Sequence, residues 1–140
     1  MASQSSDTTV PQQAAVIAFR RSPQGPDVCL IRRRGSGKWG IPKGFIDPGH
    51  TAKEAALIEA FEEAGLEGRI VGRRVGLYRY RKWSARLTVA VYLMEVVAEH
   101  RTWQEMKVRE RRWQSLDDAG GLLARHPVRA CWKRIRARLT

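Results

Sequence analysis

The segment between residues 51 and 65 constrains the fold of this chain most, because it predicts a helix whose two ends are both defined. Thr51 and Glu54 have the spacing of a capping box, in which each side chain bonds the backbone of the other residue. Gly65 follows the helical run and supplies the usual glycine stop. We therefore expect one helix here, with the rest of the chain arranged around it.

Three glutamates are expected on one face of this helix. Glu59, Glu62 and Glu63 stand at i, i+3 and i+4, which places their Cβ atoms about 5–6 Å apart. Like charges at this spacing destabilise a helix unless a cation lies between them, and Mg²⁺ and Mn²⁺ prefer such oxygen ligands. The alternative is a solvated acidic face paired with arginines. Apolar side chains on the opposite face are expected to pack on the core: Ala56, Leu57, Ile58, Ala60, Phe61 and Ala64.

The flanking segments predict strands on both sides of the helix. Strands are expected over residues 14–20, 27–34, 68–82, 86–97 and 111–116, a short extended segment over 38–44, and short helices over 117–124 and 127–138. Lys82 to Ala85 could form the turn between the two long strands. The order of strands, helix, strands and helices favours an α/β (α+β) sandwich, with a mixed sheet between helices.

We expect a single domain over residues 13–140, preceded by a polar, disordered tail over residues 1–12. The tail lacks the features of a signal peptide, and the chain has no apolar run near the roughly 18 residues of a membrane span. The expected location is therefore the cytoplasm, with no membrane partner. Cys29 lies in a strand-like run and is expected to be a core residue.

The charge of the chain favours a polyanionic partner. Lys and Arg total 26 against 14 Asp and Glu, which gives a formal net charge of +12. A surface this basic attracts nucleic acid, an anionic membrane or a highly phosphorylated small molecule, although a generally solvated basic surface is the alternative. The sequence contains no zinc-finger spacing or RNP-like aromatic motif, so nucleic acid is possible but not favoured.

Residues 44–66 resemble the Nudix box, G-x5-E-x7-R-E-U-x-E-E-x-G-U, where U is a bulky aliphatic residue. The matching positions are Gly44, Glu59, Glu62, Glu63, Gly65 and Leu66. His50 replaces the first glutamate of the pattern, Ile58 replaces its arginine, and Ala60 is smaller than the usual aliphatic residue. The segments KWGIPKG (38–44) and RERRWQSLDDA (109–119) are similar to family segments before and after the box.

The resemblance implies a Nudix-type α/β/α sandwich and a pyrophosphohydrolase that uses Mg²⁺ or Mn²⁺. Carried over to this chain, Glu59 and Glu63 would be the principal metal ligands, with the backbone carbonyl of Gly44. Glu62 would bind metal through water or act as the catalytic base that activates water. His50 could be a weak ligand, but a histidine in a loop is more often polar surface.

The compact chain, the basic run Arg32 to Arg34, the W-x-x-P-x-G approach and the HPV segment (126–128) resemble the diphosphoinositol polyphosphate and diadenosine polyphosphate branch of the family. This resemblance implies a polyanionic small-molecule substrate. Several basic residues are expected to bind it: Arg32, Arg33, Arg34, Lys38, Lys43, Lys82 and Arg109. The sequence leaves a monomer and a homodimer equally open.

Two other functions are also compatible with the sequence. One is a pyrophosphohydrolase of nucleoside triphosphates or RNA 5′ ends, since four aromatic residues could stack a base or could simply pack in the fold: Trp39, Tyr78, Tyr80 and Trp83. The other is a non-catalytic Nudix-fold module that binds polyphosphate, which the departures at His50 and Ile58 suggest.

Overall fold

Strand β1 (Gln13–Ser22) is the centre of the fold in this computed structural model, which describes residues 9–140. Its residues from 13 to 19 are all buried, because the strand has helices on both of its faces and strands along both edges. Most of the tail predicted for residues 1–12 lies outside the described residues. Gln12, just before β1, is already hydrogen-bonded to the sheet, because its backbone N–H donates to the Thr88 carbonyl at 3.1 Å.

The remaining elements follow in chain order. They are β2 (Gly25–Arg33), β3 (Lys43–Phe45), α1 (Ala52–Ala64), β4 (Leu66–Ile70), β5 (Gly76–Lys82), β6 (Ala85–Glu99), β7 (Arg109–Ser115), α2 (Leu116–Leu122), the 3₁₀-helix η2 (Pro127–Cys131) and α3 (Trp132–Leu139). The predicted strands and short helices are therefore present, except that the helix predicted over 127–138 is divided into η2 and α3 and the strand predicted over 68–82 is interrupted. Among the described residues, no helix combines the length and the apolar character needed to cross a membrane.

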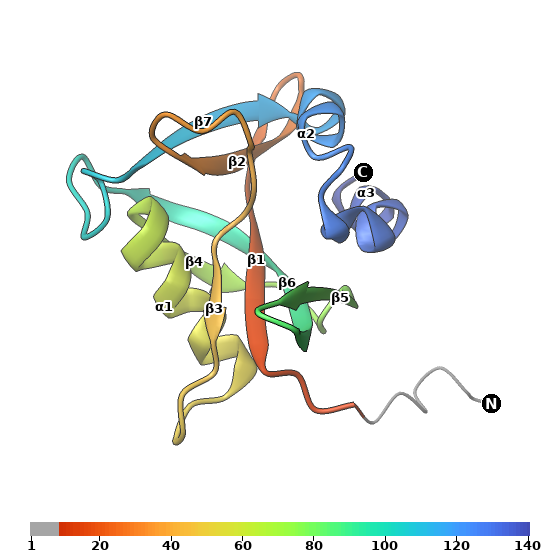
Figure 1. Cartoon of the computed structure of the whole chain (residues 1–140). Helices are drawn as coiled ribbons and strands as arrows, with labels where there is room; N and C mark the ends of the chain where they lie inside the picture. Colours follow the sequence, from red (N-terminus) through yellow and green to blue (C-terminus); the bar gives the residue numbers. More distant parts are fainter. Residues whose placement is uncertain (1–8) are drawn as a thin grey trace.

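The sheet is mixed, and helices cover both of its faces (Figure 1). Its strand order is β4-β6-β1-β2-β7, with β1 parallel to β6 and antiparallel to β2 and β3. Alternate residues of β1 enter two separate cores. Ile17 and Phe19 pack with α2, η2 and α3, whereas Val16 and Ala18 pack with α1. The predicted α/β/α sandwich is confirmed.

The strand pairing is interrupted along one edge of β1 and along one edge of β6. Along one edge of β1, β2 pairs with residues 18–22 and β3 pairs with residues 13–15, so the chain leaves the edge over residues 34–42. Along the outer edge of β6, β4 pairs with residues 94–99 and β5 with residues 85–91. We call these interruptions the β1 edge gap (residues 34–42) and the β6 edge gap (residues 71–75).

The β6 edge gap corrects the prediction of one continuous strand over residues 68–82. Val71 donates to the Leu93 carbonyl and Val75 to the Val91 carbonyl, so the chain between them bulges out of the ladder. Gly72 has φ of 72°, a left-handed conformation that glycine adopts without strain. The turn between β5 and β6 is confirmed, with Trp83 and Ser84 both at positive φ.

Helix α1 begins and ends where the sequence predicts. Thr51 and Glu54 form the capping box, and Gly65 has the left-handed conformation, with φ of 66°. The predicted division into an acidic and an apolar face is only partly right, because Phe61 is 45% exposed while Glu63 is only 7% exposed. The side that packs on the sheet is made of alanines: Ala55, Ala56, Ala60 and Ala64. Their short side chains leave room for Glu63 on the same side.

Candidate active site

A cleft of about 250 Å³ opens at the β1 edge gap, where β2 and β3 leave a space along β1. Residues from β2, from the segment 36–43, from α1, from β7 and from the start of η2 enclose it: Ile31, Arg32, Arg33, Ser36, Lys38, Gly40, Ile41, Lys43, Glu63, Arg109 and His126. Gly40 holds the segment against β2 through two backbone hydrogen bonds with Ile31, of 3.0 and 2.7 Å. Five of the predicted substrate-binding residues therefore meet around Glu63.

The Glu59 carboxyl group lies directly against Gly44, so a larger residue at position 44 would displace this carboxyl group. A Cβ atom added to Gly44 would lie 2.3 Å from the Glu59 carboxyl carbon, closer than any real contact. One turn along α1, Glu63 accepts a hydrogen bond from the Lys43 backbone N–H at 3.1 Å. The structure thus brings Glu59, Glu63 and Gly44 together, as the box spacing predicts.

Both carboxyl groups are harder to ionise than an ordinary glutamate. Burial raises the pKa of Glu59 to about 8, and the charges of Glu63 and then Glu62 add to this effect. Burial also raises the pKa of Glu63, against the opposing charge of Arg109, whose guanidinium lies 3.4 Å from Oε2. Carboxylates held together at this cost provide the kind of oxygen pair that a hard cation neutralises.

These residues fit a divalent cation that completes its coordination with substrate or water. No group of three or more His, Cys, Asp or Glu side chains is arranged to hold a metal within residues 9–140. Mg²⁺ and Mn²⁺ are commonly bound by one or two carboxylates together with phosphate oxygens, and Glu59 and Glu63 supply such a pair.

Glu62 lies further out than the other two box glutamates. Its side chain borders a different hollow, on the outer side of α1, together with Leu57, Ile58 and Phe61. Its backbone carbonyl accepts a hydrogen bond from Glu105 at 3.1 Å. Ile58 therefore contributes to this outer hollow rather than to the cleft, and His50 is exposed in the loop before α1.

Glu105 is a further carboxylate of the site that the sequence analysis missed. Its Oε1 accepts a hydrogen bond from Arg109 Nε at 2.6 Å, and its negative charge raises the pKa of both Glu59 and Glu63. Glu105 comes from the loop between β6 and β7, far from the box in sequence. Its position in the chain gave no local signal that could have identified it.

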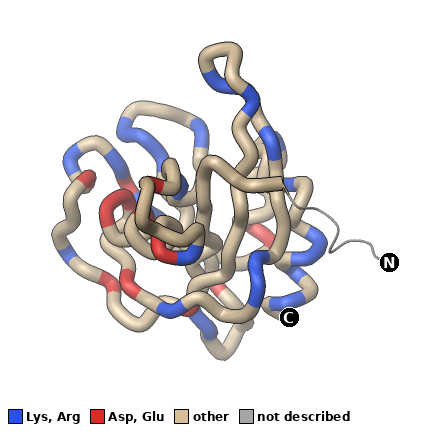
Figure 2. The backbone as a smooth tube through the Cα atoms, turned by 90° about the horizontal axis from the view of Figure 1, so that it is seen from below, with Lys and Arg blue, Asp and Glu red and all other residues tan. Residues whose placement is uncertain are grey.

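Most of the predicted substrate-binding cations face the cleft, but two do not. Arg34 donates to the Met106 carbonyl at 2.9 Å, and Lys82 lies 4.5 Å above the Trp83 ring at the β5–β6 turn. The cations that do line the cleft are Arg32, Arg33, Lys38, Lys43 and Arg109. Figure 2 shows basic residues spread over much of the chain, so net charge alone does not mark the site.

Hydrogen bonds hold both the backbone and the side chain of Lys43 in place. Its backbone N–H donates to Glu63, and its Nζ donates to the Tyr80 hydroxyl at 3.2 Å. Tyr80 in turn donates to Gln13 Oε1 at 2.7 Å. Tyr80 therefore positions a cation, while Tyr78 is buried in the core and Trp83 is 84% exposed at the turn.

His126 is a second residue of the cleft that the sequence analysis did not single out as a binding group. Its Nδ1 accepts a hydrogen bond from the Val128 backbone N–H at 3.0 Å, so its hydrogen is on Nε2. Burial, together with the charge of Lys43, lowers the pKa of His126 to about 4. The ring is therefore an uncharged donor at neutral pH.

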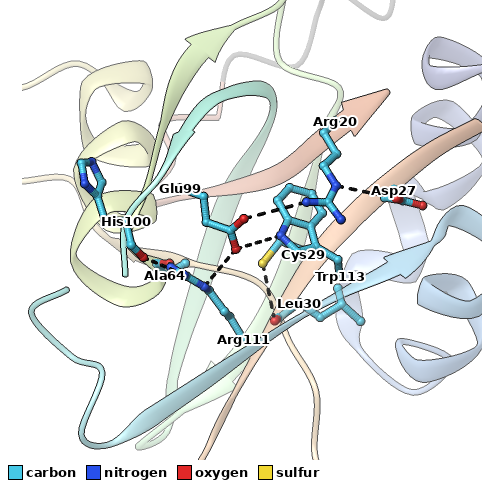
Figure 3. A network of polar contacts seen from close by, with 9 residues as sticks. All are labelled: Arg20, Asp27, Cys29, Leu30, Ala64, Glu99, His100, Arg111 and Trp113. Atoms are coloured by element: carbon cyan, nitrogen blue, oxygen red, sulfur yellow. Dashed lines mark hydrogen bonds and ion pairs between the residues drawn. The ribbon is translucent and has the colours of Figure 1, made fainter. Parts of the chain in front are cut away.

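Contacts from β7 fix the carboxyl end of α1, as Figure 3 shows. Arg111 donates to the carbonyl of Ala64, the last residue of α1, at 2.7 Å and to that of His100 at 2.6 Å. Its guanidinium also lies 3.2 Å from the Glu99 carboxylate. Trp103 adds a hydrogen bond to the Glu63 carbonyl at 3.0 Å. The helix is thus anchored although Ile58 replaces the arginine of the box.

Comparison with known proteins agrees with this geometry. The NUDIX domain profile matches residues 11–134, which is most of the chain. The chain belongs to the NUDIX family. Its members hydrolyse phosphorus-containing acid anhydrides, and this chain is such a hydrolase.

Named relatives and solved structures support the assignment. Human diphosphoinositol polyphosphate phosphohydrolase 3-alpha is 29% identical over 122 residues, which cover 85% of this chain and 73% of that protein. The bovine 3-beta protein is 30% identical over the same coverage. An Ap4A hydrolase from C. elegans, solved as a binary complex, has a TM-score of 0.77 at 20% identity, covering 93% of this chain and 98% of that one. The latter likeness shows the fold.

Proposed function

We propose that this chain is a divalent-metal-dependent pyrophosphohydrolase that cleaves a phosphoanhydride in a highly phosphorylated small molecule, such as a diphosphoinositol polyphosphate or a diadenosine polyphosphate. One observation carries the proposal. The carboxyl groups of Glu59 and Glu63 meet beside Gly44, and Glu63 faces a cleft whose rim is basic. Such a site attracts the phosphates and the cation that bridges them.

The cations of the cleft bind and orient the phosphate chain. Arg33 and Lys38 have no acidic partner among the described residues, so their charges face the ligand. Arg109 is shared between Glu63 and Glu105, and it therefore directs these carboxylates as well as lining the cleft. Fixed cations of this kind stabilise the charge that develops on phosphate oxygens.

Mg²⁺ or Mn²⁺, when bound, would polarise the phosphate and lower the pKa of an attacking water. Glu59, Glu63 and the Gly44 carbonyl are the groups that would hold it. The family resemblance assigns the catalytic base to Glu62, whose side chain borders the outer hollow of α1. Glu59, which lies beside Glu63 and Gly44, is the alternative candidate for the base. Comparing Glu62→Gln with Glu59→Gln across a range of pH decides which carboxylate accepts the proton: the variant of the base loses the acidic limb of the rate profile.

A hydrolysis screen with Mg²⁺ and with Mn²⁺ tests the proposal directly. The substrates are a diphosphoinositol polyphosphate, diadenosine tetraphosphate and single nucleoside triphosphates. We expect turnover of the first or second class, and loss of this turnover in Glu63→Gln. Turnover of nucleoside triphosphates alone would favour the nucleotide or RNA-end alternative. If folded wild-type protein turns over none of them with either metal but binds them, the non-catalytic polyphosphate-binding module is the better description.

A further inference from the structure

A second hollow, of about 610 Å³, lies beside the cleft. It is formed by the segment 37–39 on one side and by the end of α2 with the start of η2 on the other. Its lining consists of Gly37, Lys38, Trp39, Gly121, Leu122, Ala124, Arg125, His126 and Pro127. None of the residues proposed above as metal ligands contributes to it.

The cleft and the hollow are adjacent and share two lining residues. Lys38 and His126 line both of them, so a molecule in the cleft can extend past these two side chains. The cleft alone is smaller than the roughly 300–1,000 Å³ of ordinary small-molecule sites, whereas the two volumes together fall within that range. The cleft has room for a diphosphate, and the hollow has room for the group attached to it.

The chemistry of the two parts is different. Arg32, Arg33, Lys38, Lys43 and Arg109 give the cleft five cationic side chains. The hollow has only Lys38 and Arg125, and much of its remaining wall is carbon, from Trp39, Leu122, Ala124 and Pro127. Several phosphates buried against such a wall would lose more water than Lys38 and Arg125 can compensate. A flat heteroaromatic ring gains from the carbon surface of Leu122, Ala124 and Pro127. Trp39 adds little open ring surface, because it is only 9% exposed and the Arg32 guanidinium lies 4.4 Å from its ring centroid.

We propose that the hollow binds the base of a nucleoside at one end of the polyphosphate, so that the preferred substrates are dinucleoside polyphosphates rather than inositol pyrophosphates. This inference rests on the proposed function, because it places the phosphates of the same substrate in the cleft. An inositol pyrophosphate carries phosphates around its whole ring and has no apolar face of this kind to place in the hollow.

His126 has a defined part in this arrangement. Its ring lies against Gly40, where a Cβ would be 3.6 Å from both Cδ2 and Nε2, and it packs edge-on to Tyr78. The hydrogen bond from Val128 fixes Nδ1 as the acceptor, which leaves Nε2–H at the junction of cleft and hollow. An uncharged donor there can bond the phosphate oxygen that leads to the nucleoside.

Gly121→Leu tests the proposal by filling the hollow. Gly121 lies in α2, and an added Cβ meets no other atom within 4 Å, so the fold tolerates the change and leucine favours the helix. Leu122→Ser is a second variant, which removes apolar wall instead. Val97→Ser serves as the matched control, since Val97 is a 68% exposed apolar residue outside the cleft and the hollow.

The measurement is binding by calorimetry, with Ca²⁺ present to keep turnover slow, for diadenosine tetraphosphate and for inorganic tripolyphosphate. We expect Gly121→Leu and Leu122→Ser to weaken the adenosine ligand about tenfold more than tripolyphosphate, and Val97→Ser to give no such difference. Equal weakening of both ligands, or none, overturns the inference. Because the readout is binding, it decides the inference even when the hydrolysis screen fails, and such a failure speaks only against the proposed function.

Discussion

The two edge gaps of the sheet are alike in construction and different in chemistry. Each gap arises where two strands pair, one after the other, with the same edge of a neighbouring strand. Arginines line the cavity at each gap. The cavity at the β6 edge gap is about 360 Å³, and no carboxylate lines it. Its lining consists of Phe19, Arg21, Val71, Gly72, Arg73, Leu93, Arg138 and Leu139. At the β1 edge gap, by contrast, the cations surround Glu63.

The arginines of the two gaps also have different partners. At the β6 edge gap, Arg138 donates to the carbonyls of Arg73 and Arg74 at 2.6 and 3.2 Å, and Arg21 donates to the Leu139 carbonyl at 3.3 Å. These guanidiniums join α3 to the sheet and the loop. The comparison teaches that an arginine-lined hollow is not by itself a site. A carboxylate pair, and cations whose donors are not used by the backbone, distinguish the β1 edge gap.

The largest effect should follow from removing the carboxylate that distinguishes the β1 edge gap. We expect Glu63→Gln to lower kcat by about 10²–10⁴-fold, because a neutral amide neither holds the cation nor completes the carboxylate pair. Steady-state kinetics and circular dichroism measure activity and fold together. Arg73→Gln, at the β6 edge gap, is the control. A similar loss of activity in both variants would contradict the distinction between the gaps.

Replacing one arginine of each gap by glutamine tests the comparison further. Arg109→Gln should lower kcat/KM about 10–100-fold, since the charged hydrogen bond to Glu63 and a phosphate contact are lost together. Arg138→Gln should instead lower the free energy of unfolding by about 1–2 kcal/mol and leave kcat/KM nearly the same. Urea titration and kinetics on both proteins separate the effects. If Arg138→Gln is the more damaging to kcat/KM, the assignment of the two gaps is reversed.

Metal should stabilise the protein through the β1 edge gap alone. At a Mg²⁺ concentration of 100 times its Kd, the expected gain is about 2.7 kcal/mol, or several degrees in Tm. Removal of the metal with a chelator should reverse the gain. Thermal melts of Glu63→Gln should show little of it, whereas Arg73→Gln should keep it. A Tm that rises equally in both variants would place the bound metal elsewhere.

The smallest expected effect concerns pH. Because the pKa of His126 is lowered to about 4, the unfolded chain takes up a proton below its ordinary pKa of 6.5 while the folded protein does not. The contribution of His126 to the free energy of unfolding should therefore fall as the pH decreases from 6.5 to 4, whereas the raised pKa of Glu59 acts in the opposite direction. His126→Gln should weaken this dependence, and His50→Gln, a change at an exposed histidine, should retain it. Urea titrations at pH 7 and pH 5 make the comparison.

The part of the site that lies within one short segment could be predicted from the sequence. The part contributed by residues distant in the chain could not. The capping box, the stop at Gly65 and the approach of Glu59 to Gly44 depend on spacing along one short segment, which the sequence displays directly. Glu105 and His126 reach the cleft only through the β6–β7 loop and the start of η2, after the sheet has formed. The arginines looked equivalent in the sequence because their partners are distant in the chain.

Two errors have identifiable physical causes. The prediction of a strand over 68–82 missed the β6 edge gap, because most residues there suit a strand and Gly72 alone indicates the bulge. The prediction for α1 placed Phe61 among the core-packing residues and Glu63 on the opposite face. A count of apolar residues overlooks that a helix face made of alanines comes close enough to the sheet to bury a glutamate beside them.

Residues 34–42 leave the β1 edge and the chain returns to it at Lys43 and Gly44. This course separates the residues that select the substrate from those that align the reacting groups. Lys43 and Gly44 rejoin the β1 edge opposite Ala15 and Ala14, and this register fixes them against α1. The segment before them carries Ser36, Lys38 and Trp39, which contribute to the cleft or the hollow. Insertions or deletions over residues 35–37 can therefore alter which molecules are accepted while the reacting groups keep their alignment. A laboratory evolution experiment that seeks new substrates should vary the length of this segment first.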